Sequence, residues 1–220
     1  MQRPYQAEMA IPVNHHTVIT GDLLMPQEAK GLVIITHCGN QHSTRYKIMA
    51  DYLVHQGFAA LTFDLLKSHN THEPPDLIGI RLMAEQLIIV SEWLLTSDQT
   101  SGFQQAYLGF STAAAIALYA AAAESTEIAA VVSISGRTDL AMEVLSVVQS
   151  PILLIVGSDE SEVIALNHAV LESIHCTKRL EVIPGASHLF EEKGALEKVC
   201  VQTSTWLEQY LHPIKLLEDR

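Results

Sequence analysis

Short apolar runs alternate with longer segments of helical periodicity along most of the chain. The run Gly31–Thr36 is continuous and rich in β-branched residues, which is typical of a strand buried on both faces of a parallel sheet. Strands that alternate with helices of ten or more residues predict βαβ units and a mostly parallel, twisted sheet with helices on both faces, the α/β class. The expected strands are 8–13, 17–24, 31–36, 58–63, 105–110, 128–134, 151–156 and 179–183, the first two antiparallel with a bend at Gly21-Asp22, and the expected helices are 46–55, 76–95, 112–123, 139–148, 161–174 and 195–211.

The chain is expected to form one domain over residues 1–220, because this length suits a single α/β domain and no linker, repeat or low-complexity segment divides it. Thirteen Lys and Arg stand against 25 Asp and Glu, a net charge of −12. This charge disfavours nucleic acids and anionic membranes as partners. The longest apolar run, 113–123, is too short to cross a bilayer and fits a buried helix.

The cysteines indicate reduced thiols. Cys38, Cys176 and Cys200 are odd in number, widely spaced and without a CxxC motif, so neither a disulfide framework nor a zinc knuckle is expected. The first twelve residues lack the apolar segment of a signal peptide, and a cytoplasmic protein is therefore expected. No acid–His spacing indicates a metal site, and none is expected at the four histidines His15, His16, His69 and His72.

Candidate chemistry follows the strand 105–110. The segment Gly109-Phe110-Ser111-Thr112-Ala113 leads directly into an alanine-rich helix. A serine on such a strand-to-helix turn is exposed, and the free N–H groups of the helix N-terminus lie where an oxyanion would form. Ser111 is therefore a candidate nucleophile, although a serine in this position could also serve only to cap the helix.

The ends of two later strands strengthen this interpretation. Asp159 follows the strand 151–156, and His188 follows the strand 179–183. A histidine can take the proton from a serine hydroxyl while a carboxylate orients the ring and stabilises the imidazolium. The order Ser…Asp…His is the one that α/β-hydrolases use. Taken singly, Asp159 could be a turn residue and His188 a loop histidine.

With these residues, the sequence resembles the α/β-hydrolase superfamily and, within it, the small cap-less dienelactone-hydrolase-like proteins. The resemblance implies a hydrolase fold without a lid domain and a cofactor-free serine hydrolase acting on a small carboxylic ester or lactone through an acyl-enzyme. The matching segments are 36–39 (THCG), 63–66 (FDLL), 109–112 (GFST), 135–140 (SGRTDL), 157–160 (GSDE) and 184–192 (PGASHLFEE).

The resemblance also implies residue roles. It maps the nucleophile to Ser111, the orienting acid to Asp159 and the base to His188. It places the oxyanion hole at the backbone N–H of Thr112 and at one amide of the turn 37–40, where we favour Gly39 over Cys38.

The sequence departs from the family pattern at two positions, since Ala113 replaces the last elbow glycine and Cys38 replaces the glycine after His37. The Cys38 side chain restricts the backbone where an N–H must be aimed, and the thiol could itself be a second nucleophile, although no base is assigned to it.

Three further expectations concern the surroundings of the site. Arg137 could bind a substrate carboxylate, but a structural pair with Asp139 is preferred. His37 is expected to anchor its own loop. Since only residues 135–150 separate two strands where many relatives insert a lid, a shallow pocket is expected between the loops 37–44, 64–75 and 136–145. A peptidase, amidase or thioesterase with the same triad, or a non-catalytic binding protein on this scaffold, remain the alternatives.

Overall fold

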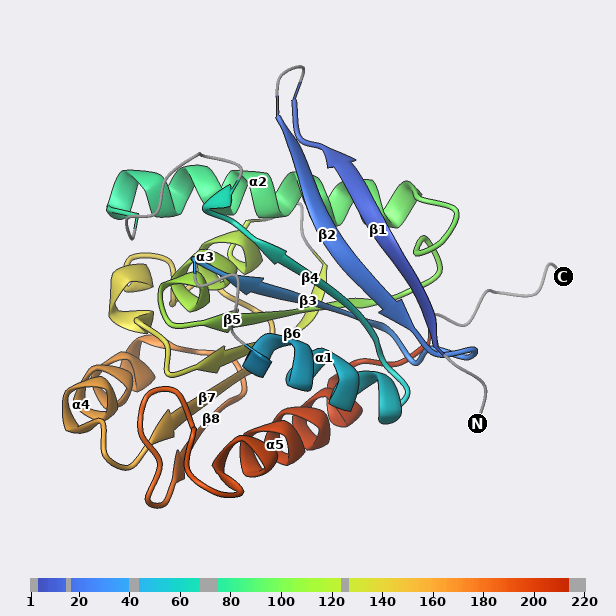
Figure 1. Ribbon diagram of the computed structural model, residues 1–220. Coiled ribbons are helices and arrows are strands. Elements are labelled where there is room, and N and C mark those ends of the chain that lie inside the picture. Colours follow the sequence, from blue (N-terminus) through green and yellow to red (C-terminus); the bar gives the residue numbers. More distant parts are fainter. Residues whose placement is uncertain (1–3, 15–16, 40–43, 68–74, 124–126, 214–220) are drawn as a thin grey trace, which may run out of the picture.

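The computed structural model describes residues 4–14, 17–39, 44–67, 75–123 and 127–213 (Figure 1). Eight strands form one sheet in the order β1-β2-β4-β3-β5-β6-β7-β8, in which β1, β2 and β4 pair antiparallel and all later pairs are parallel. The strands are β1 (Tyr5–Pro12), β2 (Val18–Met25), β3 (Leu32–His37), β4 (Ala59–Asp64), β5 (Gln105–Phe110), β6 (Ile128–Ile134), β7 (Ile152–Gly157) and β8 (Lys178–Ile183). The helices are α1 (Thr44–His55), α2 (Leu77–Thr96), α3 (Thr112–Ala121), α4 (Ser161–Val170) and α5 (Ala195–Tyr210), with 3-10 turns η2 (Thr138–Ala141) and η3 (Leu171–Ser173).

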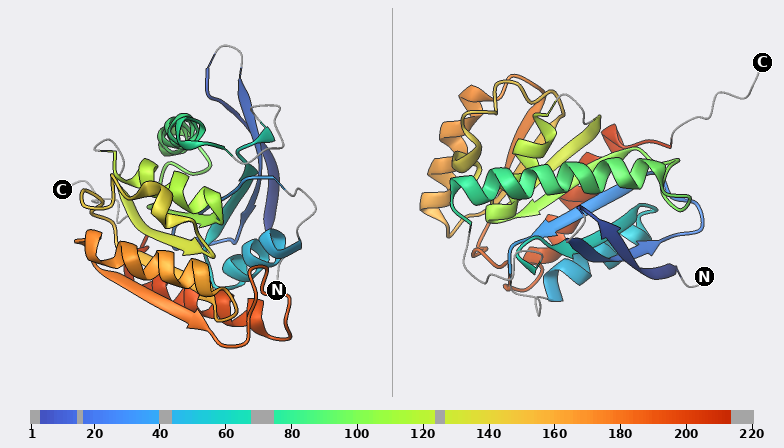
Figure 2. Two further views of the ribbon diagram at one scale, coloured as in Figure 1. Left: turned by 90° about the vertical axis from the view of Figure 1, so that its left-hand side faces the viewer. Right: turned by 90° about the horizontal axis from the view of Figure 1, so that it is seen from above.

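Helices cover both faces of the sheet, as predicted. On one face the core is formed with α2 and α3, and on the other with α1 and α5 (Figure 2). Every residue of the central strands β3, β5 and β7 is buried, which explains their continuous apolar sequences. The α/β class and the parallel sheet are therefore confirmed.

Two local predictions are wrong. Gly21 marks no bend but lies inside β2, where a Cβ would meet the Leu61 side chain and the Thr62 carbonyl of β4 at 3.0 and 3.1 Å. The predicted helix 139–148 is reduced to the 3-10 turn η2 and further turns. In this segment backbone amides donate to the carbonyl three residues back, as the Val144 amide does to the Ala141 carbonyl, which is the pattern of 3-10 turns.

The parallel strands bring their carboxyl ends to one edge of the sheet. This edge holds the loops that follow β3, β5, β6, β7 and β8, and open parallel sheets bind ligands at this edge. Between β6 and β7 the chain has only residues 135–151, without a lid domain. In the described parts of the chain no helix is long and apolar enough to span a membrane. The three cysteines are free thiols.

Candidate active site

Ser111 occupies a sharp turn between β5 and α3. Its backbone has φ 52° and ψ −122°, a conformation that residues with a side chain rarely adopt and that costs free energy. The turn is held on both sides, because the Ser111 amide donates to the Ile134 carbonyl and the Ser111 carbonyl accepts from the Arg137 amide. The Ser111 side chain makes no capping hydrogen bond to the helix. The strained backbone predicted for a nucleophile elbow is confirmed, and a plain helix cap is disfavoured.

The residues around Ser111 explain how the turn fits. A Cβ at Gly109 would lie 2.6 Å from the Ala113 carbonyl and from the Ala114 backbone, so only glycine lets strand and helix approach this closely. Ala113 is completely buried in the packed core. Its methyl group is therefore accommodated at the position where the family pattern has a second glycine.

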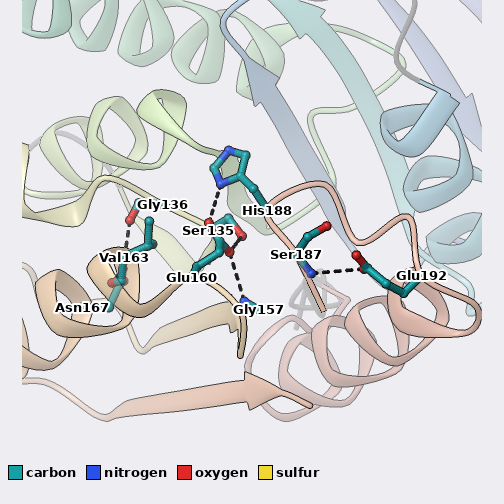
Figure 3. A network of polar contacts seen from close by, with 9 residues as sticks. All are labelled: Ser135, Gly136, Gly157, Glu160, Val163, Asn167, Ser187, His188 and Glu192. Atoms are coloured by element: carbon teal, nitrogen blue, oxygen red, sulfur yellow. Dashed lines mark hydrogen bonds and ion pairs between the residues drawn. The ribbon is translucent and has the colours of Figure 1, made fainter. Parts of the chain in front are cut away.

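His188 contacts a carboxylate from the neighbouring loop. Its Nδ1 lies 2.5 Å from Oε1 of Glu160 (Figure 3). The Glu160 side chain is only 7% exposed, and its other oxygen accepts hydrogen bonds from the Ser135 hydroxyl at 2.6 Å and the Gly157 amide at 3.1 Å. Since an ionised carboxylate only accepts, Nδ1 must carry the proton, and Nε2 is left as the acceptor.

The prediction that Asp159 contacts His188 is therefore wrong. Asp159 is exposed, and its carboxylate accepts a hydrogen bond from the Ser158 hydroxyl at 3.1 Å. After β7 the chain turns tightly, with the Glu160 amide donating to the Gly157 carbonyl, so successive side chains leave the turn in different directions. This turn directs Glu160, the first residue before α4, toward His188 and Asp159 toward solvent.

The loops that carry Glu160 and His188 are fastened to each other. The Gly185 amide donates to the Ser158 hydroxyl at 2.7 Å, and the Asp159 amide donates to the Ala186 carbonyl at 3.0 Å. A Cβ at Gly157 would lie 2.2 Å from that carbonyl, so the close approach of the loops requires glycine there. The His188–Glu160 pair is thus held by backbone contacts as well as by its own hydrogen bond.

The turn after β3 does not leave the Gly39 amide free to serve as the predicted oxyanion donor. Gly39 has φ 75°, and its amide donates to Oδ1 of Asp64 at 3.0 Å. The same oxygen accepts from the Leu66 amide at 2.9 Å. The Gly39 N–H is thus engaged by Asp64, which leaves the Cys38 amide as the candidate in this turn. Thr112 begins α3, whose first amides have no partner within the helix.

The side chains of this turn are not suited to nucleophilic chemistry. Burial and, to a lesser degree, the nearby Asp64 charge raise the pKa of the Cys38 thiol to about 12, so the reactive thiolate is scarce at neutral pH. His37 stacks on Tyr46 with ring centroids 4.1 Å apart and contacts the Gly39 carbonyl at 3.1 Å, which confirms its anchoring role. Burial lowers the pKa of His37, against the smaller opposing effect of Asp64.

Arg137 makes the structural pair that the sequence analysis preferred. Its Nε and one terminal nitrogen each lie 2.9 Å from an oxygen of Asp139. This bidentate hydrogen bond raises the pKa of the guanidinium. Asp139 thereby takes the bidentate site formed by Nε and one terminal nitrogen of the guanidinium.

Two cavities flank the site. One, of about 710 Å³, reaches His37, Tyr46 and Asp64 and continues between α1 and the β1–β2 hairpin. The other, of about 810 Å³, lies between α1 and the segment after His188, beside Leu189 and Phe190. Ser111 lines neither of them. The loops 37–44 and 64–75, predicted as pocket walls, lie partly outside the described residues.

No cluster of metal-binding side chains occurs in the described ranges, in which three or more His, Cys, Asp or Glu never come together in such an arrangement. The four histidines that the sequence analysis considered in this context, His15, His16, His69 and His72, lie outside those ranges.

Sequence reasoning missed the parts played by Glu160, Ser135 and Asp64. All three lie in segments that it had singled out: GSDE after β7, SGRTDL after β6 and FDLL at the end of β4. The signal was therefore present as polar residues at strand ends. Their pairing with His188, Glu160 and Gly39 could be read only from the structure.

Comparison with known proteins agrees with this architecture. Residues 31–150 match a family model described as the alpha/beta hydrolase fold. The structure of a dienelactone hydrolase from Anabaena variabilis is 35% identical, with a TM-score of 0.87, and the match covers 96% of this chain and all of that one. An esterase domain from a Rhodothermus marinus protein is 15% identical, covers 95% of this chain and 99% of that one, and has a TM-score of 0.73, a likeness of fold alone.

A curated relative from Mycobacterium tuberculosis carries a different name. It is 39% identical over 195 residues, or 88% of this chain, and its provisional name is phosphoribosyl transferase. The match covers only 44% of that protein. The chain thus spans less than half the length of the curated relatives that it matches.

Proposed function

Because the chain belongs to the α/β-hydrolase family, we propose that it is a serine hydrolase that cleaves small carboxylic esters or lactones through an acyl-enzyme on Ser111. The observation that carries the proposal is the strained Ser111 turn, together with the His188–Glu160 pair 2.5 Å apart at the same edge of the sheet. A helix cap would require no such strain, and a loop histidine would require no buried carboxylate partner.

In the proposed mechanism, His188 Nε2 takes the proton of the Ser111 hydroxyl as Oγ attacks the ester carbonyl carbon. Glu160 stabilises the imidazolium through Nδ1. The N–H groups of Thr112 and Cys38 stabilise the tetrahedral oxyanion. The imidazolium then protonates the leaving alkoxide, which gives the alcohol and the acyl-enzyme. His188 then deprotonates a water molecule that attacks the acyl carbon, and it returns the proton to Ser111 Oγ as the acyl–Oγ bond breaks, which releases the acid and restores the free serine.

Small substrates are favoured because only residues 135–151 join β6 to β7, which leaves no lid to enclose a long acyl chain. The dienelactone hydrolase at 35% identity supports esters or lactones as the bond type. The transferase name of the Mycobacterium relative is not carried over, since more than half of that protein lies outside the match.

The test is labelling of the purified protein with a fluorophosphonate, followed by peptide mapping. We expect one label per chain, on Ser111. We also expect hydrolysis of p-nitrophenyl acetate, and lower rates with p-nitrophenyl esters of longer acyl chains. Because activated esters also react with surface side chains, the rate of heat-denatured protein is subtracted as the blank. Absence of label, or a label on another residue, would contradict the proposal.

Cys38 is expected to contribute its backbone amide and not its thiol. Cys38→Ala keeps the Cβ and removes only sulfur, so kcat should be little changed. Iodoacetamide at pH 7 should not inactivate the enzyme, because the raised pKa of the Cys38 thiol, about 12, leaves almost no thiolate. Alkylation of Cys38 should accelerate only in strongly alkaline solution. A loss of activity in Cys38→Ala with an unchanged melting temperature would show that the thiol itself acts.

A further inference from the structure

Ser135 at the end of β6 is a buried serine in a costly backbone conformation. It is only 2% exposed and has φ 42°, in the left-handed region that favours glycine. Such strain persists only where the surroundings over-determine it, and it gathers at functional sites. The Ser135 amide donates to the Ile155 carbonyl of β7, which holds the backbone in this position.

The Ser135 hydroxyl donates to Oε2 of Glu160 at 2.6 Å, the oxygen that does not contact His188 (Figure 3). Within the described residues, the other donor to that oxygen is the Gly157 amide at 3.1 Å. Since both carboxylate oxygens are held, the carboxylate plane cannot rotate without breaking a hydrogen bond. The hydroxyl of Ser135 thereby fixes the direction in which Oε1 faces His188.

The segment after Ser135 and the helix after Glu160 are also joined by the side chain of Asn167. Asn167 on α4 is completely buried and donates to the Gly136 carbonyl at 2.9 Å, and it accepts from the Thr138 hydroxyl at 3.0 Å. Glu160 directly precedes α4, so this amide ties the helix to the segment that follows Ser135. This fully buried contact therefore helps to hold the Ser135 hydroxyl and the Glu160 carboxylate in position relative to each other.

We propose that Ser135 is a positioning residue that acts through Glu160: it holds the carboxylate in the orientation that supports His188 during acyl transfer. The inference rests on the proposed hydrolase function and adds a fourth member to its hydrogen-bonded chain. Ser135 itself touches neither substrate nor nucleophile in this role. Its contribution is to keep the His188 ring in the productive tautomer and direction.

A pair of substitutions separates the hydroxyl from the backbone strain. Ser135→Ala removes the hydroxyl and keeps the Cβ, whereas Ser135→Gly removes the hydroxyl and also relieves the left-handed conformation. We expect both variants to lose kcat for p-nitrophenyl acetate by about 10- to 100-fold, the usual effect of one hydrogen bond to a charged group, with KM little changed. Their melting temperatures should differ, with that of the glycine variant higher.

Ser133 provides the matched control. It lies two residues earlier on β6 and is completely buried, and its hydroxyl has no hydrogen-bond partner among the residues that the structure describes. Ser133→Ala should therefore leave kcat and KM unchanged. If Ser133→Ala and Ser135→Ala lower kcat equally, the effect reflects β6 packing and the inference is overturned.

A double-mutant cycle tests whether Ser135 acts through the carboxylate. In Glu160→Gln, adding Ser135→Ala should cost little further activity, because the group that Ser135 positions is already lost. If the two losses multiply instead, Ser135 acts independently of Glu160 and the inference is wrong.

A readout without substrate separates this inference from the proposed function. In ¹⁵N-histidine-labelled protein, the proton between His188 and Glu160 should give a downfield NMR resonance, assigned by its absence in His188→Gln. Ser135→Ala should move or broaden this resonance, and Ser133→Ala should not.

An unchanged resonance and an unchanged kcat in folded Ser135→Ala would overturn the role of Ser135 alone. An unlabelled Ser111 with no ester hydrolysis in the wild type overturns the proposed function, and the catalytic role of Ser135 with it, even where the resonance responds.

Discussion

Glu160→Gln is expected to lower kcat for ester hydrolysis by about 10⁴-fold, while Asp159→Asn is expected to retain nearly full activity. Glutamine keeps the volume of Glu160 but removes the charge that would stabilise the imidazolium of His188, and its amide can present an N–H to Nδ1 and favour the wrong tautomer. The Asp159 side chain is exposed, and among the described residues its carboxylate accepts a hydrogen bond only from the hydroxyl of its neighbour Ser158.

The measurement is kcat and KM for p-nitrophenyl acetate in both variants, with thermal melts to show that each is folded. Glu160→Asp is informative as a third variant. Its carboxylate is one methylene shorter and would have to leave either His188 or the Ser135–Gly157 pair, so activity should fall although the charge remains. A large loss in Asp159→Asn with an active Glu160→Gln would restore Asp159 as the acid.

Ser111→Ala is expected to lower kcat by a factor on the order of 10⁴ to 10⁶ and to abolish fluorophosphonate labelling, since removal of a nucleophile leaves only the oxyanion hole and binding. Alanine also has a Cβ, so the strained backbone of the turn is the same in both proteins. A loss of activity therefore reports the hydroxyl and not a changed fold.

The control for this prediction is Ser161→Ala. Ser161 also lies at the start of a helix, α4, but is exposed and follows a different turn. Its substitution should leave labelling and kcat unchanged. Full activity in Ser111→Ala, with loss in Cys38→Ser, would transfer the nucleophile to Cys38 despite its raised pKa.

The two predictions test different parts of the proposal. Loss of labelling in Ser111→Ala identifies the nucleophile, whatever the acid is. The contrast between Glu160 and Asp159 identifies the acid, and it would remain informative if the natural substrate were an amide or a thioester, because the proton relay is the same for each bond.

The sequence alone determined the α/β class, the strands, the helical covering and the turn that carries Ser111. These features are local or periodic. Short apolar runs rich in β-branched residues, such as Leu32–His37, form strands that are buried on both faces because helices cover both sides of the sheet. The Ser111 turn could be predicted because a glycine before it and an alanine-rich helix after it leave few conformations for the segment between.

Only the tertiary structure decided which side chains and amides meet. Asp159 and Glu160 are adjacent carboxylates in an aperiodic turn, and which of them faces His188 depends on a loop 28 residues further along the chain from Glu160. The Gly39 amide is engaged by Asp64, 25 residues away. The hydroxyl of Ser135 reaches Glu160 across 25 residues and two neighbouring strands. Propensity and periodicity describe neighbours along the chain, whereas these contacts are set by how strand ends pack together at the edge of the sheet.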